Sequence, residues 1–242
     1  MNVLIVHAHP ETASFTTAMR DAAADTLTEA GHEVLISDLY EMKFNPVASA
    51  NDFLGRANED YLVYALEQRH ADSNGLLAPD IKIELDKVVW ADLIIFNFPI
   101  YWFSMPAIMK GWLDRVFVSG RCYGGMRFYD RGGMKGKRAL VSLTLGGQPH
   151  MFEADGVHGP LHDMLRHLLR GTLGYLGFEV LPPFIGWHVP YISQDSRIAL
   201  LDTFRARLRT LDSQQAMVFP SLDDFDELLH PKAPSTTQGR QG

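Results

Sequence analysis

The sequence has little of what several classes of protein require. Its single cysteine, Cys122, excludes an internal disulfide and a cysteine-rich zinc or iron–sulfur site, and it suits a reducing compartment. Its 22 basic residues are outnumbered by 29 acidic ones, so no broad basic face is available for nucleic acid or for an anionic membrane surface. The longest apolar stretch, residues 93–103, is about half a bilayer span and contains Asn97 and Pro99. We therefore expect no nucleic-acid partner and no stable membrane insertion.

The amino-terminal end also lacks the basic region of a signal peptide, because Met1 and Asn2 are followed directly by the apolar run Val3–Val6. We expect a cytoplasmic protein. A chain of 242 residues that is 46% hydrophobic can bury a full core without disulfides.

The composition changes along the chain in two places. Residues 51–79 are too long for a simple connection and predict a partly helical excursion. The segment after Pro231 lacks apolar residues, and we expect it to be mobile. We predict one domain over residues 1–212, followed by a C-terminal extension over residues 213–242.

Short apolar runs alternate with amphipathic segments. The runs predict strands at residues 3–6, 33–37, 92–98, 139–145 and 178–181. Helices are expected at residues 15–30 after a Ser14 cap, at 160–175 and at 193–211. A further helix is expected after Ser104, where apolar residues from Met105 to Phe117 follow a 3.6-residue period. Strands that alternate with helices indicate an α/β fold with a parallel sheet covered on both faces. Five strands favour the flavodoxin-like doubly wound variant, which binds ligands beyond the carboxyl ends of its strands.

The first of these strand ends leads into a polar loop, residues 7–17, which feeds a helix N-terminus. Such an end carries a partial positive charge and free N–H groups, so it can hold phosphate without a lysine. The same residues would also make an ordinary capped loop. No G-x-G-x-x-G follows this strand, which argues against a Rossmann dehydrogenase. A P-loop-like stretch at residues 132–137 lacks the flanking residues of that motif and precedes a strand instead of following one.

The third and fourth strand ends are distinctive in other ways. Residues 98–106 combine four aromatic residues with two prolines, which would build either a stiff ledge for a planar ring such as an isoalloxazine or ordinary core packing. Gly146 and Gly147 would let backbone N–H groups approach a ligand, or form a plain turn. His158 could donate to a developing anion or serve as a structural hydrogen-bonding group. His162 lies four residues further on, but no third ligand is evident, so we expect no metal.

Four segments carry a resemblance to a known family: LIVHAHPETASFTTAM at 4–19, SDLYEMKFNP at 37–46, FPIYWFSMPAIMKGWLDRVF at 98–117 and GVHG at 156–159. The chain resembles the flavin-dependent NAD(P)H:quinone oxidoreductases of the flavodoxin-like superfamily, the diaphorase type, from Val3 to about Leu211. The resemblance implies a homodimer with two FAD sites at its interface, FMN being the less favoured cofactor. It also implies a ping-pong reaction in which NADPH or NADH reduces the flavin and a quinone then takes the same place and leaves reduced by two electrons.

The resemblance also assigns residues. The positions for the dinucleotide part of FAD are matched by His9, Phe15, Thr16, Thr17 and Ala18. The wall beside the isoalloxazine is matched by Pro99, Ile100, Tyr101, Trp102 and Phe103, and the loop at the polar edge of the ring by Thr144, Leu145, Gly146 and Gly147. Arg197 matches an arginine that contacts FAD. Tyr123, Phe152 and His158 match substrate-binding positions, Tyr123 acting from the partner subunit and His158 as the catalytic histidine.

Two departures from the family pattern bear on function. Phe152 replaces a tyrosine that the family pairs with the histidine, and phenylalanine has no hydroxyl to donate. Gly125 stands where many quinone reductases have a further aromatic residue, which would leave a wider mouth. Both departures are similar to a bacterial sub-branch that includes ancillary flavoproteins of potassium-efflux antiporters. The alternative function is therefore a regulatory subunit of such a transporter with secondary quinone reductase activity; a one-electron carrier is a third.

Overall fold

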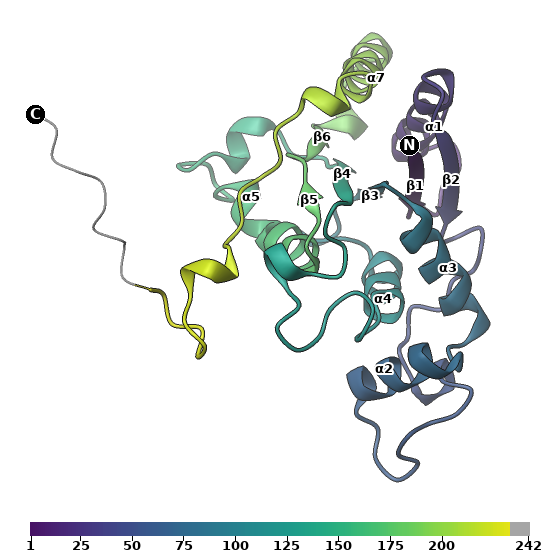
Figure 1. The fold of residues 1–242 in the computed structure, drawn as a ribbon. Coiled ribbons are helices and arrows are strands. Elements are labelled where there is room, and N and C mark those ends of the chain that lie inside the picture. The colour runs from purple at the N-terminus through teal and green to yellow at the C-terminus, as the bar shows by residue number, and fades with distance from the viewer. Residues whose placement is uncertain (233–242) are drawn as a thin grey trace, which may run out of the picture.

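The computed structural model describes residues 1–232 and contains a parallel sheet in the order β2-β1-β3-β4-β5 (Figure 1). Its strands are β1 (Asn2–His7), β2 (Glu33–Asp38), β3 (Leu93–Pro99), β4 (Arg138–Thr144), β5 (Glu179–Val180) and β6 (Phe184–Gly186). This strand order confirms the predicted flavodoxin-like doubly wound fold.

The fifth position of the sheet consists of two short strands, where a single strand over 178–181 was expected. β5 pairs with the start of β4 at Arg138 and Ala139, and β6 pairs with its end from Ser142 to Thr144. Pro182 and Pro183 lie between the two short strands. Because proline has no N–H to donate to a neighbouring strand, the ladder is interrupted there.

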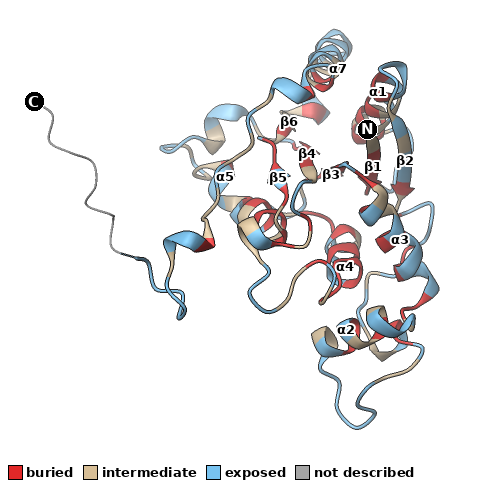
Figure 2. Cartoon of the chain, in the orientation of Figure 1, coloured by how far each residue is buried: buried red, intermediate tan, exposed pale blue. Residues whose placement is uncertain are grey.

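The central strands are buried on both faces, as their unbroken apolar runs predict (Figure 2). Successive side chains of β1 alternate between two core clusters: Val3 and Ile5 belong to one, Leu4 and Val6 to the other. The first cluster packs under α1 (Phe15–Glu29) and α7 (Gln194–Leu208), and the second under α3 (Pro79–Trp90) and α4 (Ala107–Val116).

Helix boundaries follow local chemistry. Ser14 caps α1 as predicted, its Oγ accepting the Thr17 N–H at 3.0 Å. α4 is shorter than expected, because its cap is Pro106 and its last helical residue is Val116. The single helix expected at residues 160–175 is wrong: α5 (Leu161–Met164), α6 (Arg166–Leu168) and a π-helical stretch (Leu169–Gly174) replace it. The Phe219 ring lies 3.0 Å from the position that a Cβ on Gly174 would take, so the C-terminal extension packs directly on this irregular backbone.

The excursion is partly helical, as predicted. It contains a 3-10 turn (Ala50–Asp52) and α2 (Tyr64–Asn74), and Figure 1 shows α2 below α3 and α4. The tail that we expect to be mobile falls largely on residues 233–242, which lie outside the described residues. The domain boundary expected at residue 212 stays a prediction. Within residues 1–232, no helix combines the length and apolar character needed to cross a membrane.

Candidate active site at the carboxyl ends of the strands

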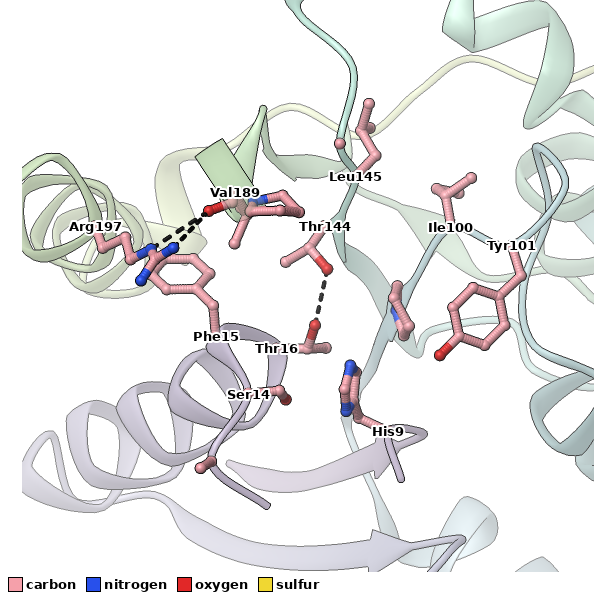
Figure 3. A pocket seen from close by; sticks show the side chains of 14 residues that line it. His9, Ser14, Phe15, Thr16, Ile100, Tyr101, Thr144, Leu145, Val189 and Arg197 are labelled. Atoms are coloured by element: carbon pink, nitrogen blue, oxygen red, sulfur yellow. Dashed lines mark hydrogen bonds between the residues drawn. The ribbon is translucent and has the colours of Figure 1, made fainter. Parts of the chain in front are cut away.

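β1, β3 and β4 end at the same edge of the sheet, and the segments that follow them enclose a cavity of about 460 Å³ (Figure 3). The cavity is lined by His9, Ala13, Ser14, Phe15, Thr16, Pro99, Ile100, Tyr101, Thr144, Leu145, Gly146, Val189, Pro190 and Arg197. A hydrogen bond of 2.8 Å between Thr16 Oγ1 and Thr144 Oγ1 joins the start of α1 to the end of β4. The cavity is therefore built where the start of α1 is joined to the end of β4.

A buried polar network supports the Thr16 side of the cavity. The Asn97 side-chain amide donates to His7 Nδ1 at 2.8 Å and to the Thr16 carbonyl at 2.8 Å, while Asn97 Oδ1 accepts from Ser142 Oγ at 2.8 Å. Because a carbonyl can only accept, the Thr16 carbonyl fixes the orientation of the amide, and His7 Nδ1 must be the acceptor. Burial lowers the pKa of His7 to about 4, so the ring is neutral near pH 7.

The N-terminus of α1 is open to an anion. Its first turn contains no acidic residue, so the partial positive charge of the helix end is not compensated from within the helix. His9, beside it, accepts the Glu11 N–H at Nδ1 over 3.0 Å. Burial lowers the pKa of His9, which keeps the ring neutral near pH 7 and leaves Nε2 as its N–H donor. This end of the cavity can hold phosphate oxygens without a lysine.

The opposite wall is a strained aromatic turn. Tyr101 and Ser104 exchange backbone hydrogen bonds of 2.9 and 3.0 Å, which closes a tight turn around Trp102 and Phe103. Both central residues have positive φ, 49° and 58°, a conformation that such turns usually give to glycine or asparagine. The strain is on the order of 1–3 kcal/mol per residue. Trp102 is nevertheless 96% exposed, so the turn presents a large apolar surface that a ligand or a partner could cover.

The glycine loop after β4 offers unused donors. The carbonyls of Gly146 and Gly147 accept from the His188 ring and the His188 N–H, over 2.7 and 3.0 Å. The N–H groups of Gly146 and Gly147 find no acceptor among residues 1–232. A Cβ on Gly147 would lie 2.5 Å from the Phe152 ring, so only glycine lets this aromatic ring approach the loop.

Phe152 and His158 pack together beside this loop, with ring centroids 4.9 Å apart. Both rings also contact Phe103 of the aromatic turn, at centroid distances of 6.3 and 5.3 Å. The His158 backbone N–H donates to the Met151 carbonyl over 2.9 Å, which fixes the loop that presents the imidazole. The structure therefore brings His158 to the aromatic turn, although 55 residues of sequence separate it from Phe103.

Most of the residues expected at the cofactor line the cavity. Those that do are His9, Phe15, Thr16, Pro99, Ile100, Tyr101, Thr144, Leu145, Gly146 and Arg197. Thr17 instead faces inward, its hydroxyl 3.3 Å from His7 Nε2, and Ala18 lines a smaller neighbouring cavity together with Arg197. Trp102, Phe103 and Gly147 lie next to the cavity without lining it.

Tyr123 lies in a different place. It lines a separate cavity of about 220 Å³ formed with α4 and Tyr175, and its pKa is raised by burial. Val189 and Pro190 were missed by the sequence reasoning; the Val189 carbonyl accepts from the Arg197 guanidinium at 3.2 and 3.3 Å and so positions it (Figure 3). The one sequence signal for these two residues was the position of Pro190 after the last strand. Among residues 1–232, no three His, Cys, Asp or Glu side chains gather as metal ligands.

A family model described as the flavodoxin-like fold matches residues 1–211. The chain belongs to this family. It is 40% identical over 224 residues to NAD(P)H dehydrogenase (quinone) 1 of Rattus norvegicus, covering 92% of this chain and 82% of that protein. It is 43% identical over 210 residues to ribosyldihydronicotinamide dehydrogenase (quinone) of Mus musculus, covering 86% of this chain and 91% of that protein. The solved structure of a candidate quinone reductase from Klebsiella pneumoniae has a TM-score of 0.92 at 35% identity, covering 100% of this chain and 97% of that one. The resemblance seen in the sequence is confirmed.

Proposed function

We propose that this chain is a NAD(P)H:quinone oxidoreductase that binds FAD and reduces a quinone by two electrons in a ping-pong reaction. One observation carries the proposal: an anion-accepting helix end, an aromatic wall and free backbone donors meet around a single cavity. The quinone-reducing relatives support the same activity. None of the three relatives described above is named as a transporter subunit, so the antiporter alternative gains no support from them.

The residues present fit a flavin. Its phosphates need N–H donors and positive charge, which the start of α1 and the nearby Arg197 supply. Its ring system needs a flat apolar wall, and the polar edge of that ring needs N–H donors. Ile100, Tyr101 and the unpaired N–H groups of Gly146 and Gly147 meet these requirements.

We propose a homodimer for this reaction. The aromatic turn exposes Trp102 almost completely, together with 43% of Tyr101 and 40% of Phe103, and a second copy would cover this surface. Tyr123 does not line the cavity of its own chain. Its position is compatible with closing over the substrate in the cavity of the partner.

When bound, the flavin supplies the ring that takes a hydride from NAD(P)H and returns two electrons to the acceptor. The protein would orient both reactants in this one cavity, so reductant and quinone would have to occupy the site in turn. The N–H groups of Gly146 and Gly147 would stabilise negative charge at the polar edge of the ring. His158 Nε2 or Nδ1 would donate to an oxygen of the acceptor, since Phe152 has no hydroxyl for this role.

His158→Ala should lower quinone turnover at least tenfold, about 1.4 kcal/mol of transition-state stabilisation, while flavin stays bound. The reason is that His158 packs on Phe152 and Phe103 outside the main cavity, so its loss removes a donor without opening the flavin pocket. Steady-state kinetics and the visible flavin spectrum measure the two effects. Unchanged turnover would remove His158 from the mechanism.

Phe152→Tyr should retain activity, because it restores the residue found in the family at a half-buried position beside His158. Turnover close to the parent value, measured with the same quinone, is the expected result. Complete loss of turnover would mean that the pocket around Gly147 is built differently from what we propose.

The proposed function is tested most directly by releasing the cofactor from purified protein with heat and identifying it by chromatography. FAD, together with quinone reduction by NADH or NADPH, is the expected result. Protein that is colourless and takes up no added riboflavin derivative would overturn the proposal.

A further inference from the structure

A second cavity, of about 390 Å³, lies between α2 and the loop that follows α4, outside the site described above. Its lining includes two arginines, Arg69 of α2 and Arg127 of the loop. Three loop glycines, Gly120, Gly124 and Gly125, complete the wall that faces them. None of these residues lines the main cavity.

The glycines make room for an arginine. Gly120, Gly124 and Gly125 have φ values of 95°, 135° and 61°, which side chains other than glycine rarely adopt. A Cβ on Gly120 would lie 2.9 Å from Arg69 Cγ, and a Cβ on Gly124 would lie 2.9 Å from Arg69 Nη2. The glycine backbone therefore lets the Arg69 side chain lie directly over the loop.

The positive charge in this cavity is left without a carboxylate partner. Arg69 contacts Ser119 Oγ at 3.4 Å, and Arg127 donates to the carbonyls of Gly120 and Arg121 over 2.6 and 3.1 Å. Within residues 1–232, neither arginine forms an ion pair. Asp72 also lines the cavity, but both of its carboxylate oxygens accept from Arg121, at 3.0 and 3.2 Å.

This concentration of positive charge runs against the rest of the chain, whose formal net charge is −7. Two guanidinium groups line this concave site, and its one lining carboxylate is already paired with Arg121, so a bound anion would find excess positive charge there. Planar guanidinium groups bind phosphate oxygens in pairs, which gives them geometric selectivity for phosphate. We propose that this cavity binds a phosphate group.

The position of the cavity indicates which phosphate. The loop from Gly124 to Arg127 directly follows Tyr123, the residue that we propose closes over the substrate in the partner's site. This step therefore rests on the proposed function. A phosphate held here would belong to the reductant, and the phosphate that distinguishes NADPH from NADH is the 2′-phosphate of its adenosine. Free inorganic phosphate is the other source of the same chemistry.

Binding of nucleotide fragments to the flavin-loaded protein tests the proposal without turnover. In phosphate-free buffer, isothermal titration calorimetry should show adenosine 2′,5′-bisphosphate binding about tenfold more tightly than adenosine 5′-monophosphate, about 1.4 kcal/mol. Arg69→Gln and Arg127→Gln should each remove this preference. Arg205→Gln is the matched control, because Arg205 lies on α7 and pairs with Asp202 at 2.9 Å, at the opposite end of the molecule from α2 (Figure 1).

Steady-state kinetics provide a second test of the phosphate site. The ratio of the KM for NADPH to the KM for NADH should rise about tenfold in Arg69→Gln and in Arg127→Gln, and stay unchanged in Arg205→Gln. A preference for the bisphosphate that both cavity variants retain would overturn the proposal, and so would the absence of a preference together with no binding of inorganic phosphate. Inorganic phosphate that binds in the parent and not in the variants, with no preference between the two nucleotides, would overturn the assignment to the reductant.

The two proposals fail separately. Protein that shows the arginine-dependent phosphate preference but reduces no quinone with either reductant would refute the proposed function and support the phosphate site. Protein that reduces quinones equally well with both reductants in all variants would support the function and overturn the phosphate site.

Discussion

Replacing Arg115 with methionine should lower the free energy of unfolding by about 3–5 kcal/mol, because it leaves a buried carboxylate without its counter-charge. The Arg115 side chain on α4 is 3% exposed, and that of Asp52 is 2% exposed. The guanidinium contacts both oxygens of Asp52, at 2.8 and 3.1 Å, and also binds Asp80 and the Asn45 carbonyl. This one side chain therefore joins Asp52 of the excursion, and the residues Asn45 and Asp80 that flank the excursion, to α4.

The control lies on the same helix. Lys110 pairs with Asp114 at 2.6 Å, but both side chains are about half exposed, so Lys110→Met should change stability by less than about 1 kcal/mol. Adding Asp52→Asn to Arg115→Met should recover part of the loss, since the uncompensated charge is then gone. Urea unfolding at a fixed flavin concentration measures all four proteins. A loss in Arg115→Met no larger than that in Lys110→Met would show that the buried pair does not hold the excursion in place.

The architecture could be predicted because its signals are local. The apolar runs of β1 and β3 are buried on both faces, Ser14 caps α1, and the order of strands and helices restricts the topology to a parallel sheet. The predicted carboxyl ends of these strands then identified most of the residues that line the cavity, since ligands of this fold bind at the carboxyl edge of the sheet. The assignment of particular residues to flavin came from the resemblance, not from periodicity.

What the sequence could not predict depends on contacts between distant segments. Pro182 and Pro183 divide the last strand, and Phe219 packs at Gly174 where a regular helix was expected. The ion pair of Arg115 with Asp52 spans 63 residues, and Arg69 meets Gly124 across 55. Charge pairing of this kind has no period in the sequence, so only the folded arrangement distinguishes a paired arginine from an unpaired one.

Acidification should destabilise the protein through His7, by about 3 kcal/mol between pH 6.5 and pH 4. Burial lowers the pKa of His7 to about 4 in the folded state, against 6.5 for the unperturbed ring. Below pH 6.5 the unfolded chain therefore binds a proton that the folded chain does not, and stability falls as the pH falls. Above pH 6.5 both states are neutral at His7, and this contribution to the pH dependence vanishes.

The variant His7→Asn isolates this contribution, because an asparagine oxygen can take the place of Nδ1 as acceptor for the Asn97 amide without titrating. Its stability, measured by urea unfolding from pH 7.5 to pH 4.5, should fall less steeply than that of the parent below pH 6.5. If the stability of the parent and that of the variant fall in parallel, groups other than His7 cause the loss of stability in acid.

A proton on His7 Nδ1 would also repel the N–H of the Asn97 amide, which holds the Thr16 carbonyl at the cavity. Affinity for the proposed flavin should therefore weaken only as the pH approaches the folded-state pKa of about 4, and it should weaken less in His7→Asn.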